Sequence, residues 1–383
     1  MKNHQKLSSF LILLLILGTH SFAKNENSLV NIYKNGKVKF VKELVISDES
    51  LPEDIFFESL TSTALDKNGN IYVCDYRANN IKKFDSKGKF LKVIGKKGQG
   101  PGDFNWPFKI EISGNQLIVW ELRNQRISLL DLEGNFIKSV KFPLNKGWAQ
   151  KIRVLPDNKI VIEIEKNFFD EKEFPQECRI ELYTRDIEYV KTIYSKRLCR
   201  NKYITKPKWT NIPQPYNVDV YWDVSPEGKI IIGYSKNYEI EIYDPVKGKI
   251  FSFTHKYNPV EINKKDKEEF FAGIVTSVEG KIVKKGAPDY MRKIVKFPKY
   301  KPAFNSIIVD SEGNIWVHPY RKNKEEEKKY FDVFDKNGKF INEVKIIGNE
   351  SYPFGGKIIN GCLWKRTMNE EGLYEIVKYK ISN

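Results

Sequence analysis

Hydrophobic residues occur along the chain in short runs that are separated by polar turns. One phrase recurs, in which an apolar residue precedes a turn rich in Asp, Asn, Gly or Pro, and a run of β-forming residues follows. Its copies begin at Leu65, Ile112, Leu155, Val224, Val309 and, most weakly, Ile359. Turn residues between two strand-forming runs are typical of tight hairpins, in which Asn-Gly supplies positive φ angles. The pattern therefore predicts six hairpins.

A second phrase follows the first and again has the form strand, turn, strand. It begins at Phe84, Leu130 and Phe334, with looser copies at Tyr183 and Tyr243. Two hairpins per repeat give four antiparallel strands, and serial four-stranded meanders are typical of propeller blades. The sequence predicts an all-β, six-bladed β-propeller with four-stranded antiparallel blades.

The two ends of the chain complement each other. The sixth repeat finishes its third strand at Leu373–Ile381 and has no outer strand. The missing phrase occurs near the N-terminus, where a turn at Tyr33–Lys37 precedes the apolar run Val38–Ile46. We expect this run to be the outer strand of the last blade, because that pairing closes the ring and removes a free edge. Residues 24–383 are accordingly predicted to form a single propeller domain.

Residues 1–23 have the pattern of a secretory signal peptide. Lys2 and Lys6 give a basic start, an apolar run covers residues 8–18, and small residues stand at Ser21 and Ala23. Such a run is too short to span a hydrocarbon core of about 30 Å. We expect cleavage after Ala23 and export to the periplasm or the cell exterior, with an uncleaved anchor as the alternative. No other apolar run is long enough to cross a membrane.

The cysteines take their meaning from this predicted export. All four, Cys74, Cys178, Cys199 and Cys362, lie after residue 23. An even number of cysteines in an oxidising compartment permits two disulfides. Cys178 and Cys199 flank one predicted hairpin and are the favoured pair, whereas Cys74 and Cys362 would have to meet through the fold. Buried free thiols are an equally good interpretation.

Composition limits the chemistry. Lys plus Arg number 65 against 49 Asp plus Glu, which gives a formal net charge of +16. Two of the four histidines lie within residues 1–23, so a zinc site with several histidines is excluded. A single histidine without catalytic partners, such as His318, is expected to be structural. The scattered acids Asp75, Glu121 and Asp223 do not form a recognisable catalytic set. We therefore predict no catalytic residue and no cofactor.

Two stretches exceed what a blade needs, at about residues 196–216 and 256–302. Both join the outer strand of one blade to the inner strand of the next, and the second should contain a helix near 266–275 and a further turn at 288–295. The charge is one-sided in parts of both stretches: residues 196–208 contain no acid, residues 281–301 contain only Asp289, and aromatic residues are interleaved with the cations. Cations attract phosphate, sulfate or carboxylate, although a basic run can also be plain solvated surface. The candidate ligand-binding residues are Arg197, Arg200, Lys202, Lys208, Trp209, Arg292, Lys293 and Arg126.

Three motifs resemble NHL-type repeats and the bacterial six-bladed propellers related to them. They are Gly98–Pro107, Asp66–Asp75 and Asn124–Ile127. The resemblance implies that both long insertions lie on the face where the central channel opens. Some propellers of this kind are similar to lactonases that hold Ca²⁺ in the channel. The glycine-rich segment Gly95–Gly102 lacks the Lys-Ser/Thr ending of a phosphate loop and is predicted to be a crossover between blades.

Taken together, these observations favour an exported, non-catalytic binding or scaffolding protein. Its channel-mouth face would engage an anionic glycan, a lipid headgroup or an envelope protein. Nucleic acid is not expected, because exported proteins rarely meet it. The alternative is a Ca²⁺-dependent hydrolase such as a lactonase that uses the propeller channel.

Overall fold

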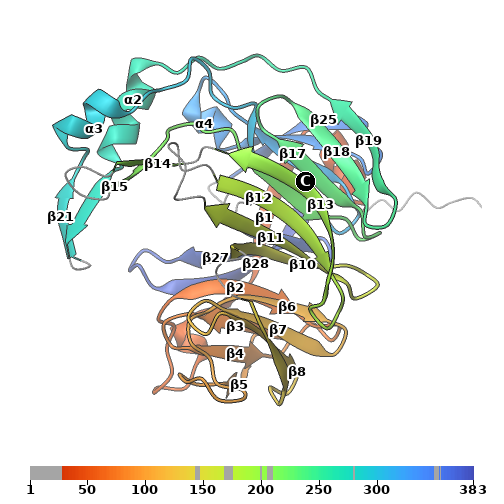
Figure 1. Cartoon of the computed structure of the whole chain (residues 1–383). Coiled ribbons are helices and arrows are strands. Elements are labelled where there is room, and N and C mark those ends of the chain that lie inside the picture. Colours follow the sequence, from red (N-terminus) through yellow and green to blue (C-terminus); the bar gives the residue numbers. More distant parts are fainter. Residues whose placement is uncertain are drawn as a thin grey trace, which may run out of the picture.

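The chain is an all-β, six-bladed propeller built from four-stranded antiparallel blades (Figure 1). The computed structural model describes residues 28–142, 147–167, 176–198, 201–204, 210–278, 281–348, 353 and 355–383. Within this part of the chain, no helix is long and apolar enough to span a membrane.

The first four blades are separate four-stranded meanders. Their strands are β2 (Leu60–Leu65), β3 (Ile71–Asp75), β4 (Asn80–Phe84) and β5 (Phe90–Ile94) in blade 1; β6 (Pro107–Ser113), β7 (Gln116–Glu121), β8 (Arg126–Asp131) and β9 (Phe136–Lys141) in blade 2; β10 (Trp148–Val154), β11 (Ile160–Asn167), β12 (Gln176–Tyr183) and β13 (Tyr189–Leu198) in blade 3; and β16 (Val220–Val224), β17 (Ile230–Tyr234), β18 (Glu239–Asp244) and β19 (Gly248–Thr254) in blade 4. In each blade the first strand is the innermost, as the repeat pattern predicts.

Blades 5 and 6 share one eight-stranded sheet. Its strands are β22 (Phe304–Val309), β23 (Ile315–Pro319), β24 (Tyr330–Phe334), β25 (Phe340–Ile347), β1 (Lys37–Ile46), β28 (Tyr374–Ser382), β27 (Cys362–Met368) and β26 (Lys357–Ile359). The antiparallel pairing of β1 with β28 confirms the predicted closure, with Phe40 opposite Ile381. The parallel pairing of β1 with β25, which joins Val38 to Ile346, was not predicted.

The polar turns between strands are held by their leading aspartates. Asp66 Oδ1 accepts hydrogen bonds from the backbone N–H groups of Asn68 and Asn70, both at 2.9 Å. Gly69 adopts a φ of 80°, while Asn68 keeps a negative φ. A two-residue Asn-Gly turn with both φ angles positive occurs instead at Asn360 and Gly361. The hairpins are therefore as predicted, but most of these turns rely on an aspartate side chain.

The hydrophobic core is divided among the six interfaces between neighbouring blades. Each interface has its own cluster of buried side chains, and the cluster between blades 6 and 1 completes the circle. Trp120, Trp222 and Trp316 are among the largest buried side chains. Since burial of one large apolar side chain contributes about 1.5–3 kcal/mol, every blade depends on both of its neighbours.

A short helix, α1 (Leu29–Lys34), covers the junction of blades 5 and 6. Its Tyr33 is buried, donates a hydrogen bond of 2.8 Å to Asp310 Oδ2 and packs edge-on against Trp316. Short single-turn elements also occur as η1 (Asp48–Ser50) and α4 (Lys324–Glu327). The sequence predicted a turn where α1 ends but did not predict the helix.

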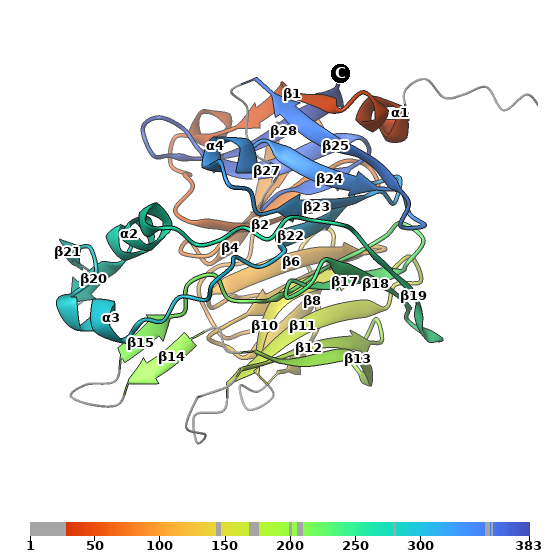
Figure 2. The same cartoon turned by 90° about the horizontal axis from the view of Figure 1, so that it is seen from above.

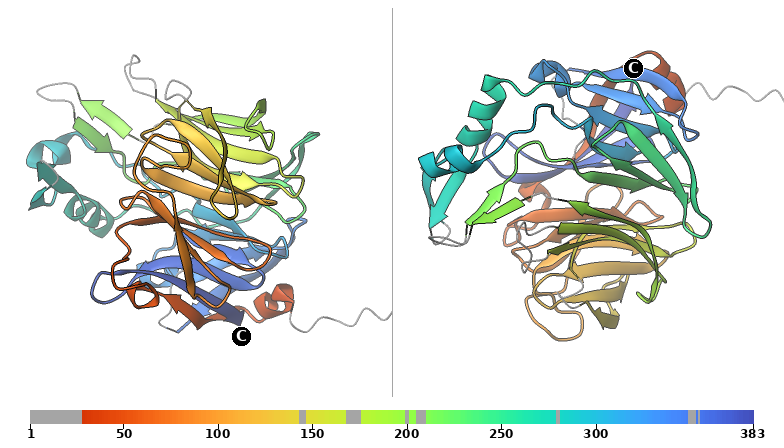
Figure 3. Two further views of the ribbon diagram at one scale, coloured as in Figure 1. Left: turned by 90° about the horizontal axis from the view of Figure 1, so that it is seen from below. Right: turned by 45° about the horizontal axis from the view of Figure 1, so that its top comes forward.

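The two insertions lie on one side of the propeller (Figures 1 and 2). They contain β14 (Asn201–Ile204) and β15 (Thr210–Pro213), then α2 (Lys264–Ala272), β20 (Val275–Val278), β21 (Lys281–Lys285) and α3 (Asp289–Ile294). We call these six elements the insertion arm; Figure 3 shows that it stands away from the blades. The helices α2 and α3 confirm the predicted helical segments, whereas both hairpins are additional.

The base of the insertion arm is fixed by a buried ion pair. Lys301 Nζ lies 3.1 Å from Asp266 Oδ1, and both side chains are 2% exposed. Tyr216 donates to the same Asp266 oxygen at 3.3 Å and thereby links the first insertion to the second. Phe271 of α2 packs with Met291 of α3 in a small core of its own.

Candidate functional site: the mouth of the central channel

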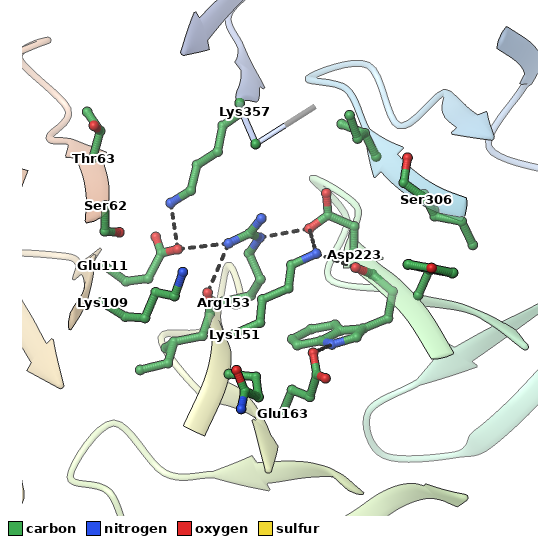
Figure 4. A pocket seen from close by; sticks show the side chains of 18 of the residues that line it. Ser62, Thr63, Lys109, Glu111, Lys151, Arg153, Glu163, Asp223, Ser306 and Lys357 are labelled. Carbon is green, nitrogen blue, oxygen red and sulfur yellow. Dashed lines mark hydrogen bonds and ion pairs between the residues drawn. The ribbon is translucent and has the colours of Figure 1, made fainter. Parts of the chain in front are cut away.

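The inner strands of the six blades surround a cavity of about 450 Å³ (Figure 4). The strands begin at the end of the channel nearest the insertions, because each insertion leads from an outer strand into the next inner strand. A second cavity of about 530 Å³ continues toward the other end. The two cavities share the lining residues Leu65, Glu111, Arg153, Asp223 and Lys357, which form the waist of the channel.

Four of the waist residues, Lys357, Glu111, Arg153 and Asp223, form a continuous chain of ion pairs. We call these four residues and Lys151 the ion ladder. Lys357 Nζ lies 2.6 Å from Glu111 Oε1, which lies 3.1 Å from Arg153 Nη1. Arg153 Nε is 2.7 Å from Asp223 Oδ1, and Lys151 Nζ is 3.5 Å from the same oxygen. The ladder crosses the channel from blade 6 through blade 2 to blades 3 and 4 (Figure 4).

The ladder exists because the repeats place equivalent residues side by side. Glu111 and Asp223 stand one residue before the start of their turn phrases, at Ile112 and Val224. Arg153 and Lys357 stand two residues before theirs, at Leu155 and Ile359. Each of the four pairs with the second strand of its blade. In blades 1 and 5 the same position holds Ala64 and Ile308. Four of the six equivalent positions are thus charged, and their signs alternate between neighbouring contacts.

The pKa values in the ladder reflect its burial. Burial alone would raise the pKa of Asp223, but the charges of Arg153 and Lys151 outweigh it and hold the pKa at about 2. Burial lowers the pKa of Lys151 to about 8 although Asp223 opposes this shift. Burial likewise lowers the pKa of Lys357 despite the nearby Glu111. Both ladder carboxylates are therefore engaged by cations that the fold has already partly desolvated.

A second layer of polar side chains lies above the ladder, two residues earlier in the inner strands. In blades 1, 2, 3 and 5 the strand pairing skips one residue directly before Ser62, Lys109, Lys151 and Ser306. Such β-bulges re-aim side chains. In blade 6 the equivalent segment contains Gly355 and Gly356, and Arg366 of the second strand lines the cavity there. We call Ser62, Lys109, Lys151, Ser306 and Arg366 the upper ring; Lys151, which also pairs with Asp223, belongs to both layers.

Three members of the upper ring retain unused hydrogen-bonding capacity. Among the described residues, no carboxylate forms an ion pair with Lys109 or Arg366; Arg366 donates one hydrogen bond to the carbonyl of Leu60. The Lys109 ammonium points into the cavity without a drawn partner (Figure 4). Ser306 is 6% exposed, and its Oγ has no hydrogen-bond partner in the part of the chain that the structure describes.

The cavity lining carries an excess of positive charge. Its cations are Lys109, Lys151, Arg153, Lys357 and Arg366, and its carboxylates are Glu111, Glu163 and Asp223. The third carboxylate, Glu163, accepts a hydrogen bond of 2.8 Å from Trp222 Nε1. Across the described ranges, no three His, Cys, Asp or Glu side chains are grouped so as to hold a metal ion. The arrangement attracts an anion rather than a cation.

Four of the predicted ligand-binding residues, Arg126, Arg197, Arg292 and Lys293, have described side chains, and none of these four lines the cavity. Arg292 forms an ion pair of 3.1 Å with Glu268 and lies over the ring of Phe271, and Lys293 is exposed on α3. Arg197 lies in β13 opposite Glu177. The backbone of Lys202 lies in β14. The predicted residues Arg200, Lys208 and Trp209 lie outside the described residues.

Arg126 has a structural task in blade 2. Its Nε lies 2.7 Å from Glu121, and its remaining nitrogens donate to the carbonyl groups of Gln99, Gly100 and Asp103. This binding holds the segment Gly95–Gly102 as the crossover between blades 1 and 2, which confirms the interpretation of that segment. Because these donors are committed to the protein itself, they give no support to the predicted ligand contact of Arg126.

The scattered acids and the lone histidine also have structural partners. Asp75 accepts hydrogen bonds of 2.9 Å from the backbone of Glu58 and Ser59 and pairs with the buried Lys82. His318 contacts Asn305 and the carbonyl of Glu327, and burial lowers its pKa to about 4.

Three of the four cysteines lie within the described residues. Cys74 and Cys362 are free thiols, and Cys74 donates a hydrogen bond to the carbonyl of Pro107. Cys178 is buried, and its Sγ lies 3.8 Å from Glu163 Oε1. Cys199 lies outside the described residues, so its pairing with Cys178 stays a prediction.

Comparison with known proteins agrees with the architecture. Residues 53–212 match the model of a family, DUF5128, described as a 6-bladed beta-propeller. No curated protein sequence matches the chain.

Several solved structures are similar over most of their length. A presumed exported protein from Bacteroides fragilis aligns with a TM-score of 0.49 and 11% identity over 91% of this chain and 95% of its own. A DUF4221 protein from Bacteroides vulgatus aligns with a TM-score of 0.48 and 14% identity over 91% of this chain and 99% of its own. Virginiamycin B lyase from Staphylococcus aureus aligns with a TM-score of 0.43 and 12% identity over 90% of this chain and 99% of its own. At such values, none of the three indicates what this chain binds.

Proposed function

We propose that this propeller is an exported, non-catalytic binding protein that engages an anionic partner through its channel-mouth face. The observation that supports this most directly is the charge of the cavity lining, with five cations against three carboxylates in the described residues. Burial of uncompensated cations costs free energy. An anionic partner would offset that cost.

The insertion arm extends this surface beyond the channel. It lies on the same side of the blades as the start of the inner strands (Figure 2). Lys293 is exposed on α3, and the residues Tyr290 and Tyr300 are 50% and 44% exposed. Cations beside open aromatic rings suit the acidic sugars of an anionic glycan, and they also suit a lipid headgroup or an acidic envelope protein.

Export remains part of the proposal. The signal-peptide pattern covers residues 1–23, which lie outside the described part of the chain. A test is to express the full-length chain and to determine the N-terminus of the product by mass spectrometry. Cleavage after Ala23 with recovery outside the cytoplasm is expected, whereas an intact cytoplasmic chain would contradict export.

The binding proposal is tested with the purified protein at low ionic strength. The probes are a uronate polysaccharide, a sulfated polysaccharide and vesicles containing phosphatidylglycerol. Binding should weaken as salt is added, because exposed charges are screened within about 10 Å at 0.1 M. The substitutions R292E and K293E should reduce it, while K67E in the turn at the far end of an inner strand should not. If no probe is retained by the unmodified protein, the proposal is wrong.

A further inference from the structure

The upper ring combines donors that come from separate blades and face one cavity. Lys109 belongs to blade 2, Ser306 to blade 5 and Arg366 to blade 6. None of these three has a carboxylate within ion-pairing or hydrogen-bonding distance among the described residues. An ammonium, a guanidinium and a hydroxyl together are the donor set that recognises an oxyanion.

The surroundings of these donors make an oxyanion favourable there. Burial lowers the pKa of Lys109, and the charges of Arg153 and Arg366 lower it further. The ladder below cannot supply a neutralising charge, because Glu111 and Asp223 are already paired. The buried Ser306 hydroxyl is also short of a partner, and leaving such a group unsatisfied costs about 1–3 kcal/mol. A bound oxyanion would compensate the charge of Lys109 and accept a hydrogen bond from Ser306.

The shape of the cavity limits the size of the ligand. Its volume of about 450 Å³ lies in the range of small-molecule sites, and the ion ladder crosses the channel at its floor. Tyr221, Trp222 and Trp364 add aromatic surface to the lining. A polymer cannot pass through the waist while the ladder is intact, so the cavity suits a single polar residue or the end of a chain.

We propose that the upper ring binds the oxyanion of a monosaccharide-sized acid, with Lys109, Arg366 and Ser306 as its donors. The inference rests on the proposed function, since it names the ligand class that the channel mouth would take. The oxyanion could be the carboxylate of a sugar acid or the phosphoryl group of a sugar phosphate. The two share the chemistry that the donors recognise and are separated by experiment.

Titration calorimetry with the purified protein at pH 7 and low salt tests this inference. The probes are glucuronate, glucose 6-phosphate and, as the neutral control, glucose. We expect one acid to bind at least about tenfold more tightly than glucose, and the identity of that acid distinguishes carboxylate from phosphoryl. Lys109→Met should weaken its binding by about tenfold or more, and Ser306→Ala by about threefold. Lys67→Met, in the exposed turn at the far end of β2, is the matched control and should change nothing.

The possible outcomes separate this inference from the proposed function. If neither acid binds better than glucose, or if K109M binds both as well as the unmodified chain, the upper ring is not an oxyanion site. Retention of a polyanion with no binding of either small acid would leave the proposed function standing and overturn the inference alone. Binding of a small acid with no retention of any polyanion or vesicle would support the upper-ring site and contradict binding of a polymer or a membrane. Folding of each variant is verified by its thermal transition.

Discussion

The channel and the insertion arm are both rich in cations, but the fold treats these cations differently. In the channel, Lys151, Arg153 and Lys357 are partly desolvated on strands that six blades hold in place. On the arm, Lys293 is exposed on a six-residue helix that packs against a small local core. A buried cation needs a compensating partner, whereas an exposed one is solvated at little cost. Positive charge alone therefore says less about a binding site than its burial does.

The largest difference in stability between the two regions is expected on substitution of Arg153. Replacement by Met leaves Glu111 and Asp223 buried with fewer partners, and removing one member of a buried ion pair typically costs about 3–5 kcal/mol. Arg292→Met on the arm should cost less than about 1 kcal/mol, because its pair with Glu268 is exposed to solvent. Urea denaturation of both variants measures the difference. Equal losses would mean that burial does not distinguish the two regions.

Lys301 separates the effect of burial from that of location, since it is a buried cation at the base of the arm. Lys301→Met removes the partner of Asp266, but Asp266 keeps its hydrogen bonds to Asn263 and Tyr216. We expect a loss of about 2–3 kcal/mol in local stability. Hydrogen exchange should accelerate in α2 and α3, and near α4, where Lys301 Nζ also lies 3.8 Å from Glu327 Oε2, and stay unchanged elsewhere in the blades. Faster exchange throughout the propeller would show that the arm is not an independent unit.

The pH dependence of the channel gives a smaller effect. The folded-state pKa of Lys151 is about 8, below its usual 10.5, so the lysine loses its charge in the folded protein as the pH rises through 8. Binding of the preferred acid to the upper ring should therefore weaken by about three- to tenfold from pH 7 to pH 9. At pH 8, binding should also take up protons, which calorimetry in two buffers of different ionisation enthalpy detects. A constant affinity over this range would show that the charge of Lys151 does not contribute to anion binding at the upper ring.

The same shift affects stability. Because the unfolded chain holds the Lys151 proton up to about pH 10.5, it binds more protons than the folded chain between pH 8 and 10.5. The destabilising contribution of this buried charge is complete below pH 8 and fades as the pH rises toward 10.5.

The smallest effect is expected on the exposed face of the arm. Lys293→Met should change the free energy of unfolding by no more than about 0.5 kcal/mol, as for most surface substitutions. A matched urea titration with the unmodified chain measures it. A larger loss would indicate that α3 contributes to the stability of the propeller.

The sequence predicted the architecture because a propeller repeats its local pattern. The leading aspartates and glycines recur at fixed positions, and the copy missing at the C-terminus is present at Val38–Ile46. The parallel contact of β1 with β25 involves only residues 37–39 and 345–347, so it leaves no comparable pattern in the sequence.

The site could not be found in the same way, because its residues are single charged positions within apolar strands. The site residues of blade 2 (Lys109 and Glu111), blade 3 (Arg153) and blade 6 (Lys357) lie far apart in the sequence, so they form no cluster along the chain. A signal was nevertheless available. In four of the six repeats, the first strand carries a charged residue one or two positions before the start of the turn phrase. Inward-facing charge at equivalent positions marks a channel, whereas the runs on the insertions mark only a basic surface.

The pairing of β1 with β28 sets the order in which the molecule can be completed. Ser382 donates a hydrogen bond to the carbonyl of Lys39 across 343 positions of the chain. A polypeptide that emerges from the ribosome or a translocation pore N-terminus first must therefore keep β1 waiting until the last residues have appeared. During that interval one apolar strand is without its neighbours, which makes the nascent chain a natural client for a holding chaperone.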